Sequence, residues 1–234
     1  MILCLETATS FCSVALCDRK GIVALKESGE GRSHASEITV FVDRILKDSV
    51  IKAYQLEAVA VSKGPGSYTG LRIGVSAGKG IAYAVSIPLI SIDTTLSMYL
   101  GFSETAREKY GITQTDLFCP ALDARRMEIY YSVFDASGRI VKPVRAEIID
   151  SNFLSDLPPS SRIFIFGDGS AKCSGVVRRD NIYVENDFRI SAAFMRTAAY
   201  EAFDNKRFED VAYFEPFYLK DFLTSKPVKN ILGK

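Results

Sequence analysis

The sequence lacks the residue patterns of a metal enzyme or a disulfide-linked protein. Histidine occurs once, at His34, and the five cysteines include no Cys-x-x-Cys pair. A single histidine cannot supply the His-x-x-x-His pair that holds zinc in many enzymes. The chain opens on an apolar run that already contains Glu6, and not on a basic region followed by an apolar one. These features favour a reduced, cytoplasmic compartment.

Long apolar stretches and an excess of one charge are also missing. The longest charge-free run near the middle, residues 80–92, has 13 residues and contains Pro88. It is too short to cross a bilayer, so we expect no membrane insertion. The net charge is +1, which provides no strong field for holding nucleic acid. The 234 residues, 47% hydrophobic and 24% charged, indicate an ordinary globular protein with a sizeable core.

The most informative stretch is residues 63–80, which is rich in glycine. It follows an apolar run at 58–61 that reads as a buried strand, and it leads into a helical pattern. Glycine and proline predict a tight turn there, and a hydroxyl at the start of the helix would cap N–H groups that can bind an anion. The predicted motif loop comprises Gly64, Pro65, Gly66, Ser67 and Thr69. Its spacing matches neither the phosphate-loop nor the dinucleotide consensus, so a turn without a ligand stays the main alternative.

Small residues recur every four positions along the helix that follows, at Gly70, Gly74, Gly78 and Ala82. Each glycine inside a helix costs about 1 kcal/mol relative to alanine, so a close contact is expected to compensate. A row of small residues lets a second helix approach closely. That helix could belong to this chain or to a partner.

The order of elements predicts two similar lobes, at residues 1–112 and 113–234. Apolar runs at 2–5, 12–17 and 22–25 indicate an antiparallel meander, followed by an amphipathic helix from Ser33. A strand at 88–92 and a helix to about residue 110 complete the first lobe. A second meander, a strand at 163–166 and two further helices form the second, and the last helix is free to pack back on the first lobe.

Hydroxyl, acidic and glycine residues gather at the predicted turns. Asp123 and Arg125, two residues apart, could bind metal and phosphate, and the hydroxyls of the turn at 7–10 could bind phosphate. Hydroxyls that bond only their own backbone, and a weak surface ion pair, are the alternatives. The predicted degenerate nucleotide cleft comprises Thr7, Thr9, Ser10, Asp123, Arg125, Gly167, Asp168 and Gly169. For His34 we expect a structural or capping role.

Several of these motifs together resemble the TsaB (YeaZ) family, the dimerisation subunit of the bacterial tRNA threonylcarbamoyladenosine machinery. The strongest is Gly-Pro-Gly-Ser-Tyr-Thr-Gly-Leu-Arg-Ile-Gly at 64–74. Residues 2–10, 33–37, 121–130, 167–169 and 216–219 resemble the family in the same order. The resemblance spans nearly the whole chain.

The resemblance implies an α/β, two-lobed actin-like ATPase fold with mixed sheets and flanking helices, as in sugar kinases, heat-shock ATPases and actin. It further implies a relative of TsaD that has lost the catalytic equipment. The region from Ile92 to Tyr110, where TsaD-like proteins carry a histidine pair, has no histidine. We therefore expect a non-catalytic subunit, with no catalytic and no metal-binding residues.

The resemblance also implies the partners. We expect a TsaD-like catalytic subunit, a TsaE-like ATPase, a homodimer when the chain is alone, and tRNA only through the complex. The complex would threonylcarbamoylate the adenosine beside the anticodon of tRNAs that read codons beginning with A. No cofactor is required, and ATP or ADP could bind at an interface of the complex. The expected partner interface on the first-lobe helices comprises Ile38, Phe41, Val42, Ile45, Gly70, Arg72, Ile73, Gly74, Ala77, Gly78, Ile81 and Ala82.

One alternative from another class is an independent enzyme of the actin-like fold. It would be an ATP-binding phosphotransferase that uses the cleft residues, or a peptidase. Glu6 stands where kinases of this fold begin an acidic phosphate-and-metal turn, but no clear catalytic base follows. The chain has neither a metal pair nor a Gly-x-Ser-x-Gly elbow for a peptidase.

Overall fold

The structure, a computed structural model, describes residues 1–28 and 34–220. Ser33, where the amphipathic helix is expected to begin, lies outside them. Five strands form the first sheet in the order β3-β2-β1-β4-β5. Neighbours among β1, β2 and β3 are antiparallel, as expected for a meander, while β4 and β5 run parallel to β1. The strands are β1 (Ile2–Glu6), β2 (Ser13–Cys17), β3 (Ile22–Glu27), β4 (Ala58–Gly64) and β5 (Leu89–Asp93).

The second sheet repeats the first in order and direction. Its order is β8-β7-β6-β9-β10, with three antiparallel strands followed by two that run parallel to β6. The strands are β6 (Leu117–Asp123), β7 (Glu128–Asp135), β8 (Ile140–Ile148), β9 (Ile163–Phe166) and β10 (Ile182–Glu185). The expected α/β architecture of two mixed sheets with flanking helices is therefore confirmed.

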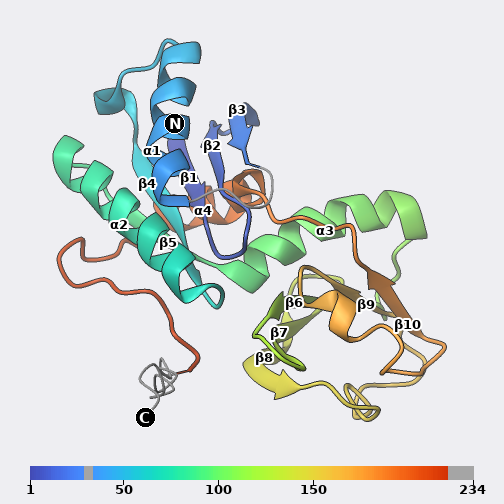
Figure 1. The fold of residues 1–234 in the computed structure, drawn as a ribbon. Coiled ribbons are helices and arrows are strands. Elements are labelled where there is room, and N and C mark those ends of the chain that lie inside the picture. Colours follow the sequence, from blue (N-terminus) through green and yellow to red (C-terminus); the bar gives the residue numbers. More distant parts are fainter. Residues whose placement is uncertain (29–33, 221–234) are drawn as a thin grey trace, which may run out of the picture.

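Helices cover both faces of the first sheet (Figure 1). The first face carries α1 (His34–Asp48) and α2 (Tyr68–Val85), and the second carries α4 (Arg196–Asp204) with the 3₁₀ turn η3 (Ala192–Met195). Side chains alternate between the faces along each strand. On β1, Leu3 and Leu5 pack under α1 and α2, whereas Ile2 and Cys4 pack under α4 and η3.

The long helix α3 (Thr94–Tyr110) leads from the first sheet to the second. Its Met98, Tyr99 and Phe102 join a cluster with Phe118, Phe164 and other aromatic side chains of the second sheet. Thus α3, which precedes the predicted boundary at residue 112, packs on the second sheet. Conversely α4, which follows that boundary, packs on the first sheet. The exact boundary stays a prediction.

Two predicted helices are shorter than expected. The first of the two further helices expected in the second lobe forms only the 3₁₀ turn η2 (Ser170–Lys172), and the last is divided into η3 and α4. The remaining short element is η1 (Ala53–Gln55). All five cysteines are buried and unpaired. None of the helices in the described residues combines the length and apolarity that a membrane span requires.

Candidate functional site

The motif loop joins β4 to α2, as the sequence predicts. Backbone atoms of other segments of the chain pack directly against its glycines. A Cβ at Gly64 would lie 2.6 Å from the carbonyl oxygen of Phe217, and one at Gly66 would lie 2.4 Å from that of Ala8. The amide of Ser67 donates to the same Ala8 oxygen at 2.7 Å. The Ser67 hydroxyl accepts from the amide of Gly70 at 3.2 Å, so Ser67 is the N-cap of α2. Thr69, the other capping candidate, is exposed in the first turn.

The row of small residues on α2 faces inward, which corrects the expectation that it receives a partner helix. A Cβ at Gly70 would lie 2.1 Å from the carbonyl oxygen of Thr7, and one at Gly74 would lie 2.2 Å from the Thr7 hydroxyl. At Gly78 the nearest atom is Val61 Cγ1, at 2.4 Å. Ala82 is buried in the same core. The close contact that compensates for these glycines is therefore made with the chain's own first sheet.

The apolar row of α1 is also largely inward. Ile38, Phe41, Val42 and Ile45 are all buried against the first sheet and α2. This argues against their place in the expected partner interface, because an amphipathic helix buries its apolar face first on its own domain. The exposed positions of α1 include Val40, at 41%.

A second row of small residues on α2 points outward. Ser76, Gly80 and Ala84 are exposed, and a Cβ added at Gly80 would meet no atom within 4 Å. Tyr83, beside this row, is 81% exposed. Of the expected interface residues, Arg72 is exposed, and Ile73, Ala77 and Ile81 are partly buried against α1 and the sheet. The outer ridge of α2, which we define as Ser76, Gly80, Tyr83 and Ala84, is shifted by two residues from the predicted stripe.

The segment after α4, residues 208–220, runs along the flank of α2 (Figure 1). Lys79 Nζ donates to the carbonyl oxygens of Ala212 and Phe214, at 3.1 and 3.0 Å. The tail then reaches the motif loop, where the amide of Phe217 donates to Lys63 O at 2.7 Å.

An aromatic clasp holds the end of this tail. The rings of Tyr68 and Tyr218 lie 4.8 Å apart, and the Arg72 guanidinium lies 4.6 Å from the Tyr68 ring. Arg72 Nε also donates to the Tyr218 hydroxyl at 3.2 Å. Sequence reasoning named the motif and residues 216–219 separately but missed their contact, because nothing in the spacing joins positions so far apart. These contacts give Tyr68 and Arg72 of the motif a structural role that requires no ligand.

The turn after β1 contains a buried carboxyl group. Glu6 is fully buried; its Oε1 accepts from the amide of Ala8 at 2.7 Å, while Oε2 has no hydrogen-bond partner in the described structure. Burial raises the pKa of Glu6 to about 7, although hydrogen bonds from Ala8, Ser62 and Thr7 lower it in part. Thr7 is buried as well, Thr9 Oγ1 accepts from the Phe11 amide, and Ser10 is exposed. Hydrogen bonding of turn hydroxyls to their own backbone, one of the two alternatives, is thus realised at Thr9.

The second half of the predicted nucleotide cleft lies at the ends of β6 and β9. Asp168 Oδ1 accepts from the Asp123 amide at 3.0 Å, and Asp123 Oδ1 accepts from Lys172 Nζ at 2.6 Å. Gly167 and Gly169 pack tightly on the carbonyl groups of Ala121 and Leu122. Arg125 has a φ of 67°, so the backbone is not extended there and Asp123 and Arg125 do not align as two residues of one strand. Each half of the predicted cleft is built by contacts within its own lobe, and nucleotide binding stays a prediction.

His34 makes a structural contact. Its Nε2 lies 3.1 Å from the carbonyl oxygen of Phe11 and links the start of α1 to the turn before β2. Within residues 1–28 and 34–220, no three His, Cys, Asp or Glu side chains gather as ligands for a metal ion.

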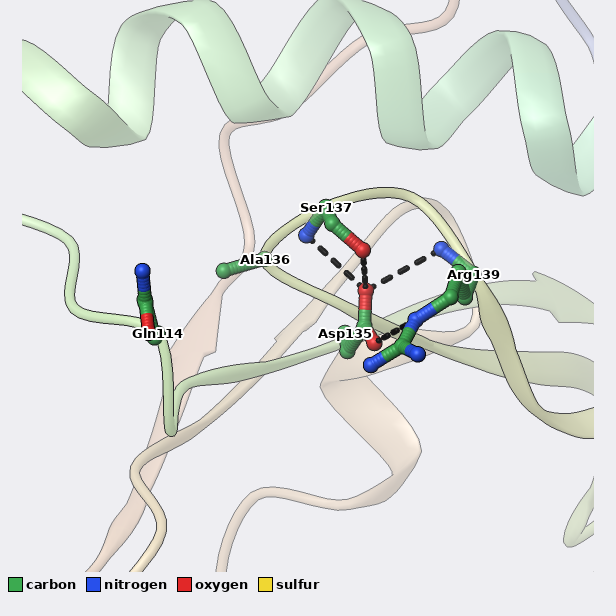
Figure 2. Close-up of a pocket in the computed structure, with 5 residues that line it drawn as sticks. All are labelled: Gln114, Asp135, Ala136, Ser137 and Arg139. Atoms are coloured by element: carbon green, nitrogen blue, oxygen red, sulfur yellow. Dashed lines mark hydrogen bonds and ion pairs between the residues drawn. The ribbon is translucent and has the colours of Figure 1, made fainter.

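A surface hollow of about 610 Å³ lies beside the turn between β7 and β8 (Figure 2). It is lined by Gln114, Asp135, Ala136, Ser137 and Arg139. Asp135 accepts from the amide and hydroxyl of Ser137 and from the amide and Nε of Arg139, at 2.6 to 3.1 Å. These bonds, led by the Ser137 hydroxyl, lower the pKa of Asp135 to about 2. The carboxylate thus stabilises its own turn.

Comparison with known proteins identifies relatives over much of the chain. A family model described as tRNA N6-adenosine threonylcarbamoyltransferase, TsaD, matches residues 27–159, more than half of the sequence. The tRNA threonylcarbamoyladenosine biosynthesis protein TsaB of Haemophilus influenzae is 34% identical over 131 residues, which cover 56% of this chain and 52% of the relative. TsaB of Escherichia coli is 35% identical over 133 residues, covering 57% and 54%. The matched region thus spans about half the length of these curated relatives.

A solved structure shares the fold over nearly its full length. YeaZ from Pseudomonas aeruginosa superposes with a TM-score of 0.75 at 21% identity, over 93% of this chain and 99% of that one. The activator of 2-hydroxyisocaproyl-CoA dehydratase from Clostridium difficile superposes with a TM-score of 0.50 at 9% identity. The duplicated mixed sheets with flanking helices match the two-lobed α/β architecture that the resemblance implied. The chain therefore belongs to the family that the TsaD model describes, and within it to the TsaB (YeaZ) group.

Proposed function

We propose that this chain is a non-catalytic subunit that binds and activates a TsaD-like transferase in the biosynthesis of tRNA threonylcarbamoyladenosine. The transferase would modify the adenosine beside the anticodon of tRNAs that read codons beginning with A. A TsaE-like ATPase is the third component, and the complex works in the cytoplasm. This chain requires no cofactor of its own, and ATP or ADP would bind at an interface of the complex.

The observation that carries this proposal is the filled motif loop. In an ATP-dependent enzyme of this fold we would expect the turn after β1 and the start of α2 to leave room for phosphate groups. Here the Thr7 carbonyl and hydroxyl occupy the space above Gly70 and Gly74, and the Phe217 carbonyl lies against Gly64. The motif therefore supports the chain's own fold, which favours a binding subunit over an independent phosphotransferase.

The outer ridge of α2 supports a protein partner. Gly80 has open space at its Cβ position, and Ser76 and Ala84 continue the small surface along the helix. Small residues allow the backbone of a second helix to come close, and the exposed Tyr83 adds apolar surface beside them. A TsaD-like subunit would occupy this ridge in the complex. A second copy of this chain would occupy it when the chain is alone.

Size-exclusion chromatography with light scattering tests the proposal directly. The purified chain is run alone and mixed with the TsaD-like protein of the same organism, and we expect a heterodimer peak in the mixture. Two unchanged peaks at low and moderate salt would overturn the subunit role. Turnover of ATP by the isolated chain, abolished by Asp123→Ala, would establish the independent phosphotransferase instead.

A further inference from the structure

The tip of the hairpin between β6 and β7 carries two arginines in an unfavourable backbone conformation. Arg125 has a φ of 67° and Arg126 a φ of 48°, both in the left-handed region that favours glycine and asparagine. Of the other non-glycine residues with positive φ, Val50, Ser86 and Lys206 lie one or two residues after α1, α2 and α4, and Leu154 lies in the turns between β8 and β9. A left-handed residue is a common way to end a helix, and hairpin turns also take positive φ, chiefly at glycine, asparagine and aspartate. Arginine at two successive left-handed positions is therefore unusual for a hairpin. The turn geometry does not require arginine at these positions, and residues that are costly for the backbone are often retained where they have a function.

Within residues 1–28 and 34–220, the carboxylates around the tip pair with groups other than the two guanidiniums. Asp123 accepts from Lys172 and from the Arg125 amide, and its own amide donates to Asp168. Glu128, directly after the tip, forms an ion pair with Lys220 of the tail. None of these three carboxylates pairs with the guanidinium of Arg125 or Arg126 in the part of the chain that the structure describes. The excess charge at the tip is therefore positive, and it belongs to two adjacent, exposed arginines.

Guanidinium groups suit phosphate in particular. The planar fork of N–H donors can bind two phosphate oxygens at once, and arginine keeps its charge at any physiological pH. Two such groups on neighbouring residues can contact successive phosphates of a nucleic-acid strand. The whole chain has a net charge of only +1, so any contact with nucleic acid must be local.

We propose that Arg125 and Arg126 bind backbone phosphates of the substrate tRNA in the assembled complex. This inference rests on the proposed function, because the TsaD-like subunit must bring the tRNA to this lobe. The tip would then add affinity for tRNA without recognising its base sequence, as phosphate contacts do. Both side chains are exposed at the tip, and the left-handed backbone there costs some fold stability.

The double variant Arg125→Gly/Arg126→Gly separates binding from folding. Glycine accepts positive φ, so we expect the variant to unfold at a higher urea concentration than the unchanged chain. Lys206→Gly is the matched control, because Lys206 is also an exposed cation with positive φ, at 54°, and it lies beyond α4 on the first lobe. The control should be stabilised in the same way without any effect on tRNA.

Binding of fluorescently labelled tRNA to the reconstituted complex is then followed by anisotropy over a range of salt concentrations. A plot of the logarithm of the binding constant against the logarithm of the salt concentration has a negative slope. Loss of two phosphate contacts should make this slope shallower by about 2 and weaken binding at low salt. An unchanged slope in a complex that still assembles would overturn the tRNA contact and leave the proposed function standing. Loss of assembly by the glycine variant alone would show that the tip binds an acidic protein surface instead. Failure of the unchanged chain to assemble would overturn both proposals.

Discussion

The Thr7 hydroxyl occupies the place where a side chain at Gly74 would begin, since a Cβ there would lie 2.2 Å from it. This contact links the turn after β1 to the helix that follows β4. It explains why α2 carries glycine at a position where alanine would favour the helix by about 1 kcal/mol. The turn and the motif helix are therefore one structural unit.

The first prediction concerns this contact. Gly74→Ala should lower the free energy of unfolding by about 1 to 3 kcal/mol, because the new Cβ overlaps the Thr7 hydroxyl. Thr7→Ala should restore much of the loss in the double variant, because the nearest remaining Thr7 atom lies 3.3 Å from that Cβ. Gly80→Ala is the control and should raise stability by about 1 kcal/mol. Urea unfolding of the unchanged chain, Gly74→Ala, Thr7→Ala, the double variant and Gly80→Ala measures these differences, and additive effects at positions 7 and 74 would contradict the contact.

The second prediction follows from the buried Glu6. The pKa of its carboxyl is about 7 in the folded chain and about 4.5 when exposed, so the folded state holds a proton that the unfolded state releases between these values. The free energy of unfolding should therefore fall as pH rises from 4.5 to 7, by about 3 kcal/mol from this group. Other ionisable groups also contribute to the pH dependence of the whole chain. The test is accordingly a difference between two chains.

Glu6→Gln removes the titration without changing the shape. Relative to the unchanged chain, the variant should gain about 3 kcal/mol in unfolding free energy between pH 4.5 and pH 7.5. Chemical unfolding at several pH values measures this gain. A constant difference across the range would mean that Glu6 is ionised in the folded protein at acidic pH.

The third prediction concerns the clasp on the tail. Tyr218→Ala removes the ring contact with Tyr68 and the hydrogen bond from Arg72, which together should stabilise the docked tail by about 1 to 2 kcal/mol. The amide of Phe217, bonded to Lys63, should then exchange with solvent about tenfold faster or more. Tyr213→Ala is the control, because Tyr213 lies on the same tail and is 84% exposed. Equal exchange in both variants, measured by hydrogen–deuterium exchange, would show that the clasp does not hold the tail.

Sequence periodicity was sufficient to predict the two sheets, because the strands of each meander are short, apolar and separated by turn residues. It could not decide what the small residues of α2 contact. Gly74 and Gly80 both lie inside α2, and only the packing distinguishes them: one faces Thr7 and the other faces open space. Contacts between distant segments were equally out of reach. Tyr68 and Tyr218 each belong to a recognisable motif, but neither motif indicates the other.

The last prediction tests the outer ridge of α2. Gly80→Leu should leave the fold intact or slightly more stable, because no atom lies within 4 Å of the new Cβ and leucine favours a helix over glycine. The same side chain would prevent close approach of a partner helix, and we expect the heterodimer to weaken by several kcal/mol. Gly21→Leu is the matched control, since Gly21 has equally open space and lies between β2 and β3. Isothermal titration with the TsaD-like protein should give normal affinity for the control and at least a hundredfold loss for Gly80→Leu. Normal affinity of a folded Gly80→Leu chain would exclude the ridge and direct attention to the exposed side of α1.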